Sequence, residues 1–176
     1  MRTFAAAALI LATACGSEAP AEKPAEKPAP AKVEEPKPAP PPAPAKPAEK
    51  DTDLSAMSED EQKAFLMSYG EKVYKTGDGG IACTTCHGPE GKGTPGAFPP
   101  LVGQKDHMGD CAKHAGIVIH GLQGELVVDG TTYNGVMTAQ GAMLNDLQIA
   151  AVITYERQSW GNDFGYCFPK DVAGAR

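Results

Sequence analysis

The pentapeptide Cys83-Thr84-Thr85-Cys86-His87 constrains this chain more than any other feature of its sequence. Two thiols three residues apart, followed directly by an imidazole, form the pattern that attaches a c-type haem. Each thiol can add across a haem vinyl group, and the short spacing then brings His87 under the ring, where its nitrogen meets the iron. Because the pattern occurs once, it predicts one covalently attached haem c, bound through Cys83, Cys86 and His87.

Two other chemistries use a close pair of cysteines. A structural zinc site usually shows two spaced ligand pairs, and Cys111 has no cysteine close to it that would form the second pair. A thioredoxin-like dithiol is expected after a strand and before a crossover helix, and His87 is not part of that pattern. Haem attachment is therefore the interpretation that the sequence favours.

The start of the chain has the layout of an export signal. An apolar stretch from Phe4 to Ala14 follows Met1 and Arg2, and it is too short to span a bilayer. The run from Leu11 to Gly16 resembles a bacterial lipobox, in which the signal is cut before a cysteine that carries lipid. We predict a signal over residues 1–14 and a lipidated N-terminus over residues 15–18, beginning at Cys15.

Ordinary cleavage after Ala12-Thr13-Ala14 is the alternative to lipidation. It would leave Cys15 as a free thiol at the start of an exported protein, which is a chemical liability. Both routes export the chain, so we expect it on the periplasmic side of a bacterial membrane, held there by the lipid.

Residues 19–52 form the next segment, which is rich in proline, alanine, lysine and glutamate. Eleven prolines lie between Ala19 and Lys50. Such a composition cannot bury a core, and frequent prolines favour extended polyproline II geometry. We expect a disordered, semi-rigid spacer, with a tail for a proline-binding module as the alternative, and a folded domain over residues 53–176.

The cysteine count allows one further assignment. The chain has five cysteines, of which one would carry lipid and two would bind haem, so Cys111 and Cys167 remain in an oxidising compartment. We predict a disulfide between them, and two unrelated buried thiols are the alternative. A bond that closes a loop of this length stabilises a fold by about 4 kcal/mol in the chain-entropy treatment.

Helix caps and apolar periodicity predict three helices in the domain. The first covers residues 59–75, the second ends at Gly121 and the last opens after Asn145. Their N-terminal caps are Ser58 with Glu61, Asp110, and Asn145 with Gln148. Between the second and the last helix, Asp129-Gly130 lies among β-favouring residues and predicts a two-residue hairpin.

Across residues 57–162 the chain resembles the class I cytochrome c family, in its small bacterial exported branch. Gly70 and Tyr74 resemble the small and aromatic pair at which the terminal helices of the family cross, and Tyr155 would meet them from the last helix. The resemblance implies a mainly α fold of about four short helices around one haem, with a small β-hairpin before the loop of the axial methionine.

The segment Tyr133-Asn134-Gly135-Val136-Met137 resembles the distal-ligand loop of this family, and Leu144-Asn145-Asp146 resembles the start of its last helix. The resemblance implies that Met137 is the sixth ligand of the iron. A neutral thioether favours ferrous iron and so raises the reduction potential relative to two imidazoles. Thr138 stands where proline commonly follows the methionine, which removes one restraint on the backbone.

Four other side chains could compete for the iron. Met143 is the nearest thioether, and the remaining histidines are His107, His114 and His120. We expect Met143 to belong to the core. We expect His114 and His120 to be ordinary histidines of the middle helix, and His107 to lie in a polar loop.

The segment Phe98-Pro99-Pro100-Leu101 resembles the stretch whose proline carbonyl accepts a hydrogen bond from the proximal histidine. The resemblance implies this role for Pro99. Such an acceptor fixes the orientation of the imidazole and raises its basicity.

The resemblance implies a single-electron carrier, not an enzyme. The sequence shows no nucleophile with a paired base, no paired carboxylates at catalytic spacing and no nucleotide-binding loop. Its expected partners are a donor, such as a dehydrogenase or membrane complex, and an acceptor, such as a terminal oxidase or reductase. The alternative is a haem peroxidase or a small-ligand sensor, which needs a labile sixth position on the iron.

The charge of the domain bears on these partners. Residues 51–176 contain nine Lys or Arg against sixteen Asp or Glu, a net charge of −7. We therefore expect redox partners with a basic docking face, and no binding to nucleic acid. The lipid would hold the domain at a membrane while the spacer lets it reach neighbouring partners.

Overall fold

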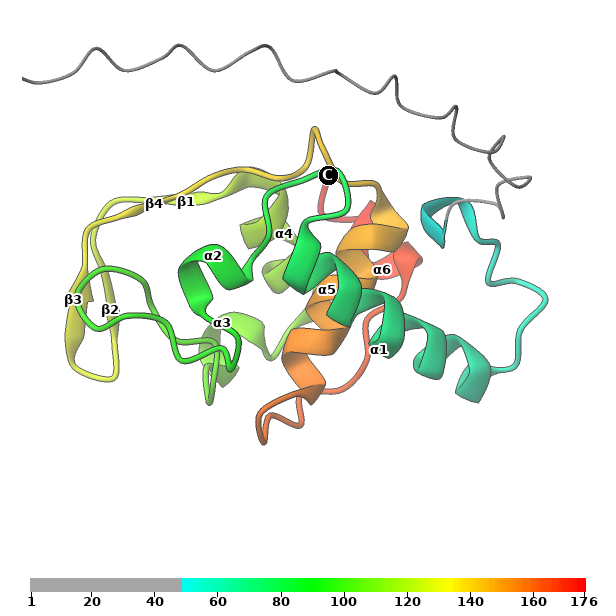
Figure 1. Ribbon diagram of the computed structural model, residues 1–176, viewed down its shortest axis with the longest axis horizontal. Coiled ribbons are helices and arrows are strands. Elements are labelled where there is room, and N and C mark those ends of the chain that lie inside the picture. Colours follow the sequence, from blue (N-terminus) through cyan, green and yellow to red (C-terminus); the bar gives the residue numbers. More distant parts are fainter. Residues whose placement is uncertain (1–48) are drawn as a thin grey trace, which may run out of the picture. The chain divides into compact units, whose positions relative to one another are not determined.

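Residues 49–176 are described by the computed structural model, so the predictions for the signal, for Cys15 and for the spacer up to residue 48 lie outside the described part. Figure 1 shows a mainly helical domain whose hairpin lies at the end away from the start of α1. The helices are α1 (Glu59–Thr76), α2 (Thr84–His87), α3 (Lys105–Met108), α4 (Cys111–His120), α5 (Asp146–Gln158) and α6 (Pro169–Ala173), preceded by a 3-10 turn, η1 (Glu49–Asp51). The predicted mainly α fold is confirmed.

Helix α1 begins and ends where its local sequence predicts. The Ser58 side chain accepts a hydrogen bond from the backbone of Glu61, and the Glu61 carboxylate accepts one from the Ser58 backbone at 2.8 Å. This reciprocal pair satisfies backbone donors that the first helical turn leaves free. The helix ends at Gly77, whose φ of 79° is accessible to glycine at little energetic cost.

Helices α1 and α5 cross at Gly70. A Cβ atom at this position would lie 2.0 Å from the carbonyl oxygen of Ala151, so only glycine allows the two backbones to come this close. Next to the crossing, the rings of Tyr74 and Tyr155 lie with centroids 5.5 Å apart, and Tyr74 also packs on Trp160. The predicted contact of Gly70 and Tyr74 with Tyr155 is confirmed.

Helix α5 is the centre of the core. Ten of its thirteen residues are buried, because α1, α4 and α6 all pack against it. Two of its polar side chains tie the chain after it into place. The Thr154 hydroxyl bonds both the N–H and the carbonyl of Cys167. Arg157 donates to the carbonyls of Phe164 and Gly165 after α5, and to that of Met108 at the end of α3.

The strands form two antiparallel pairs. The predicted hairpin is confirmed, with β2 (Leu126–Val128) paired to β3 (Thr131–Tyr133) around Asp129-Gly130. A second pair, between β1 (Leu122–Gln123) and β4 (Val136–Met137), was not predicted. It places Leu122 opposite Met137, so the chain before the hairpin fixes the backbone of the predicted axial residue.

Three short elements differ from the sequence-based expectation. The turn η1 lies within residues 49–52, which we assigned to the spacer, and there Lys72 pairs with Glu49 at 2.5 Å. Helix α3 contains His107, which we expected in a loop, and α6 was not predicted. Elements of three to five residues carry too little periodicity to be recognised in a sequence. No helix within residues 49–176 has the length and hydropathy to cross a membrane.

Replacing Gly70 by alanine tests the crossing. Because the added methyl group meets backbone that cannot move aside, we expect Gly70→Ala to lower the free energy of unfolding by about 3 kcal/mol or more. Gly116→Ala is the matched control, since nothing lies within 4 Å of its position on α4, and alanine there favours the helix by up to about 1 kcal/mol. Denaturant unfolding of the two variants measures both effects, and equal midpoints would contradict the close crossing.

Candidate haem-binding site

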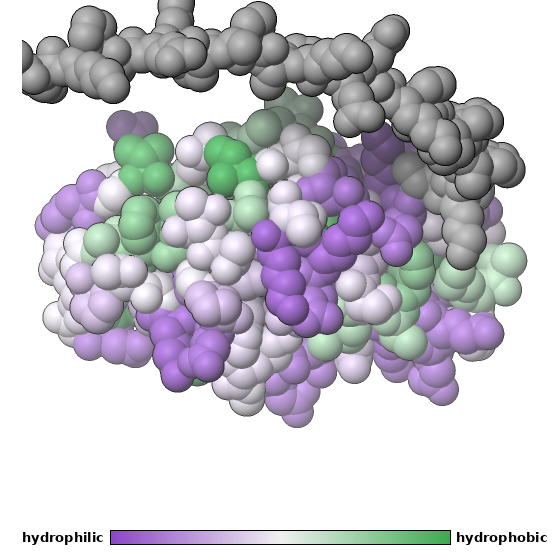
Figure 2. Space-filling model, viewed as in Figure 1, coloured by the Kyte–Doolittle hydropathy of each residue, from purple (hydrophilic) through white to green (hydrophobic). Residues whose placement is uncertain are grey.

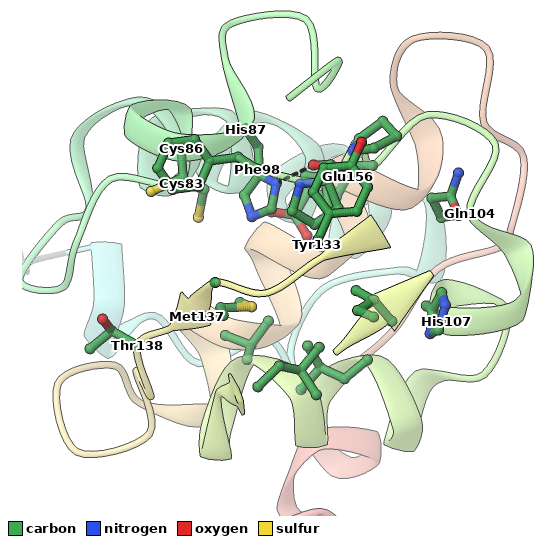
Figure 3. Close-up of a pocket in the computed structure, with 18 of the residues that line it drawn as sticks. Cys83, Cys86, His87, Phe98, Gln104, His107, Tyr133, Met137, Thr138 and Glu156 are labelled. Carbon is green, nitrogen blue, oxygen red and sulfur yellow. Dashed lines mark hydrogen bonds between the residues drawn. The ribbon is translucent and has the colours of Figure 1, made fainter. Parts of the chain in front are cut away.

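The Cys-x-x-Cys-His motif folds as a short helix. Cys83 lies at the N-terminus of α2, and the backbone N–H of His87 donates to the Cys83 carbonyl at 2.9 Å. One helical turn therefore separates the two cysteines, and Figure 3 shows both side chains on the same wall of a pocket. Both thiols are free. The end of this turn is fixed to α1, because the Tyr74 hydroxyl donates to the Gly88 carbonyl at 2.6 Å.

A hydrogen bond from the Nδ1 atom of His87 sets the orientation of its imidazole ring. The side chain is 9% exposed, and its Nδ1 lies 2.9 Å from the carbonyl oxygen of Pro99, drawn as a dashed line in Figure 3. A carbonyl only accepts, so Nδ1 carries the proton and Nε2 keeps its lone pair for a metal. Gly93 makes room for this contact, since a Cβ there would lie 2.5 Å from the Pro99 oxygen. The contact predicted for Pro99 is thus present.

Met137 lies across the pocket from His87. Figure 3 shows its sulfur on the wall opposite the imidazole, at the end of β4. The strand partner Leu122 holds its backbone, and Gly121 allows a close approach, since a Cβ there would lie 2.2 Å from the Met137 carbonyl oxygen. The structure thus brings the two predicted axial residues to facing walls of one pocket.

The walls of this pocket are mainly apolar. They include side chains from α3, α4, the hairpin and the loop after α2, among them Leu101, Met108, Val118, Leu126, Val128 and Tyr133. Four of the residues that line the pocket are exposed apolar side chains, namely Ile81, Phe98, Leu122 and Val136. Figure 2 shows exposed hydrophobic residues near the edge where β1 and β4 lie. A large flat apolar group with a metal at its centre fits these walls.

A buried polar pair lies in the pocket wall and was missed from the sequence. His114 Nε2 is 3.0 Å from a Glu156 carboxylate oxygen, and both side chains are at most 5% exposed. Within residues 49–176, Nδ1 of His114 is the one buried side-chain nitrogen or oxygen without a hydrogen-bond partner. Since Glu156 is on α5 and His114 on α4, only the packing of these helices brings them together.

The environment of Cys83 argues against a redox-active dithiol. Burial raises the pKa of the Cys83 thiol, and the Glu156 carboxylate beside it raises that pKa further. Reactive dithiols need the opposite shift, because the thiolate is the nucleophile. A structural zinc site is also unsupported, since no three His, Cys, Asp or Glu side chains gather as a metal site between residues 49 and 176.

The other candidate ligands differ in where they lie. Met143 is 42% exposed and does not line the pocket, which corrects its expected place in the core. His120 is exposed, with Nε2 3.1 Å from the Ala175 carbonyl oxygen. His107 lines the pocket at the end away from Cys83, as Figure 3 shows. Met108, which we did not consider from the sequence, is buried and also lines the pocket, so it is a second thioether to test.

The side chains of Cys111 and Cys167 lie together as a disulfide pair. They would join the first turn of α4 to the chain that leads into α6. The two residues are 56 positions apart in the sequence, so their contact depends on how α4 and α6 pack on α5.

Two free thiols and an oriented imidazole on one wall, with a thioether on the other, define a site for covalent haem of the c type. The chain belongs to the cytochrome c family, because the sequence profile of that family, described as Cytochrome c, matches residues 67–160, more than half of its length. Members of this family are electron carriers with covalently attached haem c, and this chain has one attachment motif.

Individual relatives agree with this assignment. Two proteins named cytochrome c-552 from Thermus thermophilus are 39% and 40% identical over 106 and 100 residues, which cover 56% and 53% of this chain. The alignments cover 65% and 69% of those relatives. A cytochrome c4 from Azotobacter vinelandii is 38% identical over 98 residues, which cover 51% of this chain and 41% of the relative.

The disulfide remains a prediction that alkylation can test. We expect Cys111 and Cys167 in the denatured holoprotein to react with an alkylating agent only after reduction, as peptide mass mapping would show. Replacing both by alanine is expected to lower the free energy of unfolding by about 2–4 kcal/mol, because the unfolded chain gains freedom. Alkylation of either residue without reduction would contradict the bond.

Proposed function

We propose that this protein carries single electrons in a bacterial envelope electron-transfer chain, with His87 and Met137 as the two axial ligands of its haem iron. The observation that carries the proposal is the placement of these two side chains on facing walls of one apolar pocket. The bound haem supplies the redox couple between ferric and ferrous iron. The chain supplies the ligands, their orientation and the low-dielectric walls.

The two ligands are held in different ways. Cys83 and Cys86 tie the His87 side to the cofactor, and the Pro99 carbonyl keeps the imidazole oriented and basic. Met137 offers a neutral, soft thioether, which favours the ferrous state. An enzyme or sensor would need the sixth position open, and a buried imidazole facing a partly buried thioether across the pocket favours a carrier.

The redox partners are proposed from charge. The domain carries a net charge of −7 over residues 51–176, so partners with a basic docking face would be attracted over several ångströms. A dehydrogenase or membrane complex as donor and a terminal oxidase or reductase as acceptor have the chemistry that such a carrier serves.

Absorption spectra of the holoprotein test the axial assignment. We expect a low-spin c-type spectrum with a weak red sulfur-to-iron band that disappears in Met137→Ala, because alanine offers no ligand. Met108→Ala is the matched control, since its thioether also lines the pocket, and it is expected to keep the band. Carbon monoxide should bind readily only to ferrous Met137→Ala.

Two results would contradict the assignment. A wild-type protein that is already high-spin would mean that the sixth position is open, which favours an enzyme or a sensor. A band that survives in Met137→Ala and disappears in Met108→Ala would move the ligand to α3.

We further propose that Cys15 carries lipid and that the spacer lets the domain reach partners along the periplasmic side of a membrane. The lipobox-like run and the proline-rich composition support this proposal. We expect wild-type protein in the membrane fraction and Cys15→Ser in the soluble periplasmic fraction, with Cys167→Ser as a control that stays at the membrane. Equal distribution of Cys15→Ser and wild type would exclude the anchor.

A further inference from the structure

The backbone after Met137 lacks the usual proline and is held in another way. Thr138 follows Met137, and its side chain makes no hydrogen bond within residues 49–176. Two residues further, the backbone N–H of Gln140 donates to the Val118 carbonyl at 2.9 Å, and that of Gly141 donates to the Ile119 carbonyl at 3.1 Å. The loop is thereby docked on the end of α4.

The side chain of Gln140 makes a connection of its own. It is 6% exposed and lines the haem pocket. Its Oε1 accepts a hydrogen bond from the backbone N–H of Ile81 at 2.9 Å, and its Nε2 donates to the Thr138 carbonyl at 3.1 Å. Ile81 lies two residues before Cys83, and Thr138 follows Met137 directly. One amide thus bridges the chain that enters the haem-attachment motif and the chain that leaves the predicted axial ligand.

The amide makes both bonds because it carries an acceptor oxygen and a donor nitrogen. A carboxylate could accept from the Ile81 N–H but could not donate to the Thr138 carbonyl, and an aliphatic side chain could do neither. The neighbouring residues leave the amide little freedom, because a Cβ on Gly80 would lie 2.8 Å from its Oε1 and the Leu144 side chain packs on the same glycine. Gln140 and Ile81 are 59 residues apart in the sequence, so their contact depends on the tertiary fold.

We propose that Gln140 is a positioning residue for axial ligation. Its amide fixes Met137 relative to the haem-attachment segment, and it thereby replaces the backbone restraint that a proline at position 138 would supply. The inference rests on the proposed role of Met137 as sixth ligand. Each hydrogen bond to a loop backbone adds a modest restraint, and the two act on segments that must keep a constant separation for the thioether to stay on the iron. Loss of the bridge is therefore expected to raise the fraction of protein whose sixth position is open.

The test compares Gln140→Leu and Gln140→Glu with Gln148→Leu as the matched control. Gln148 is a second buried glutamine. Its amide donates to the Asp78 carbonyl and accepts from the Asn145 N–H, but its side chain does not line the pocket. The ferrous holoproteins are mixed with carbon monoxide, and the red sulfur-to-iron band of the ferric forms is followed with rising temperature. The reduction potential is recorded for each variant.

We expect Gln140→Leu to bind carbon monoxide about tenfold faster than wild type and to lose the red band at a lower temperature than that at which the helices unfold. Gln140→Glu keeps one of the two bonds, so its rate of carbon monoxide binding is expected to lie between those of wild type and Gln140→Leu. It also tests the proposal if Gln140→Leu does not fold. Gln148→Leu is expected to unfold earlier while its carbon monoxide binding stays that of wild type.

The outcomes distinguish the proposed role of Gln140 from the proposed role of Met137 as sixth ligand. If wild type shows the red band, Met137→Ala lacks it and both Gln140 variants bind carbon monoxide as slowly as wild type, the role of Gln140 is overturned and that of Met137 stands. If Gln148→Leu opens the site as much as Gln140→Leu, the effect is general loss of stability and the positioning role is likewise overturned. If wild type already binds carbon monoxide as fast as Met137→Ala, the axial assignment itself fails.

Discussion

The crossing of α1 and α5 at Gly70 sets the geometry on which the haem pocket depends. The haem-attachment motif follows α1 after a short loop, and the loop of Met137 leads into α5, so the two walls of the pocket extend from the two crossed helices. Close backbone contact at Gly70 leaves the pair little room to slide. Tyr74 transmits this constraint to the motif, because its buried hydroxyl bonds the carbonyl of Gly88, directly after His87.

Several loops of the domain are fixed by single buried polar side chains and by closely packed glycines. The Gln140 amide, the Thr154 hydroxyl and the Arg157 guanidinium each bond backbone groups of such loops. A buried polar group without a partner is costly, so each of these side chains selects one loop arrangement. Gly93 acts in the same sense, since it lets the Pro99 carbonyl reach His87.

The pocket combines strong and weak restraints on the iron. The imidazole side would be tied by two covalent bonds and one hydrogen bond, whereas the thioether side depends on a two-residue strand pair and on loop contacts. The position of Met137, the proposed distal ligand, therefore rests on tertiary contacts of modest individual strength. The buried pair of His114 and Glu156 adds polarity to an otherwise apolar wall, beside the Cys83 thiol.

The sequence by itself determined what depends on neighbouring residues. The Cys83 to His87 motif, the caps of α1, α4 and α5 and the hairpin at Asp129-Gly130 are local patterns. The structure contains the predicted caps and the hairpin, and it folds the motif as a short helix. Only the tertiary structure decided which distant groups meet: the β1 and β4 pair, the contact of His114 with Glu156, the place of Met108 in the pocket and the Gln140 bridge. These contacts join segments far apart in the chain, and no local periodicity or capping rule encodes a contact of that kind. Their positions follow from how tightly the helices pack, which the sequence specifies only through the whole fold.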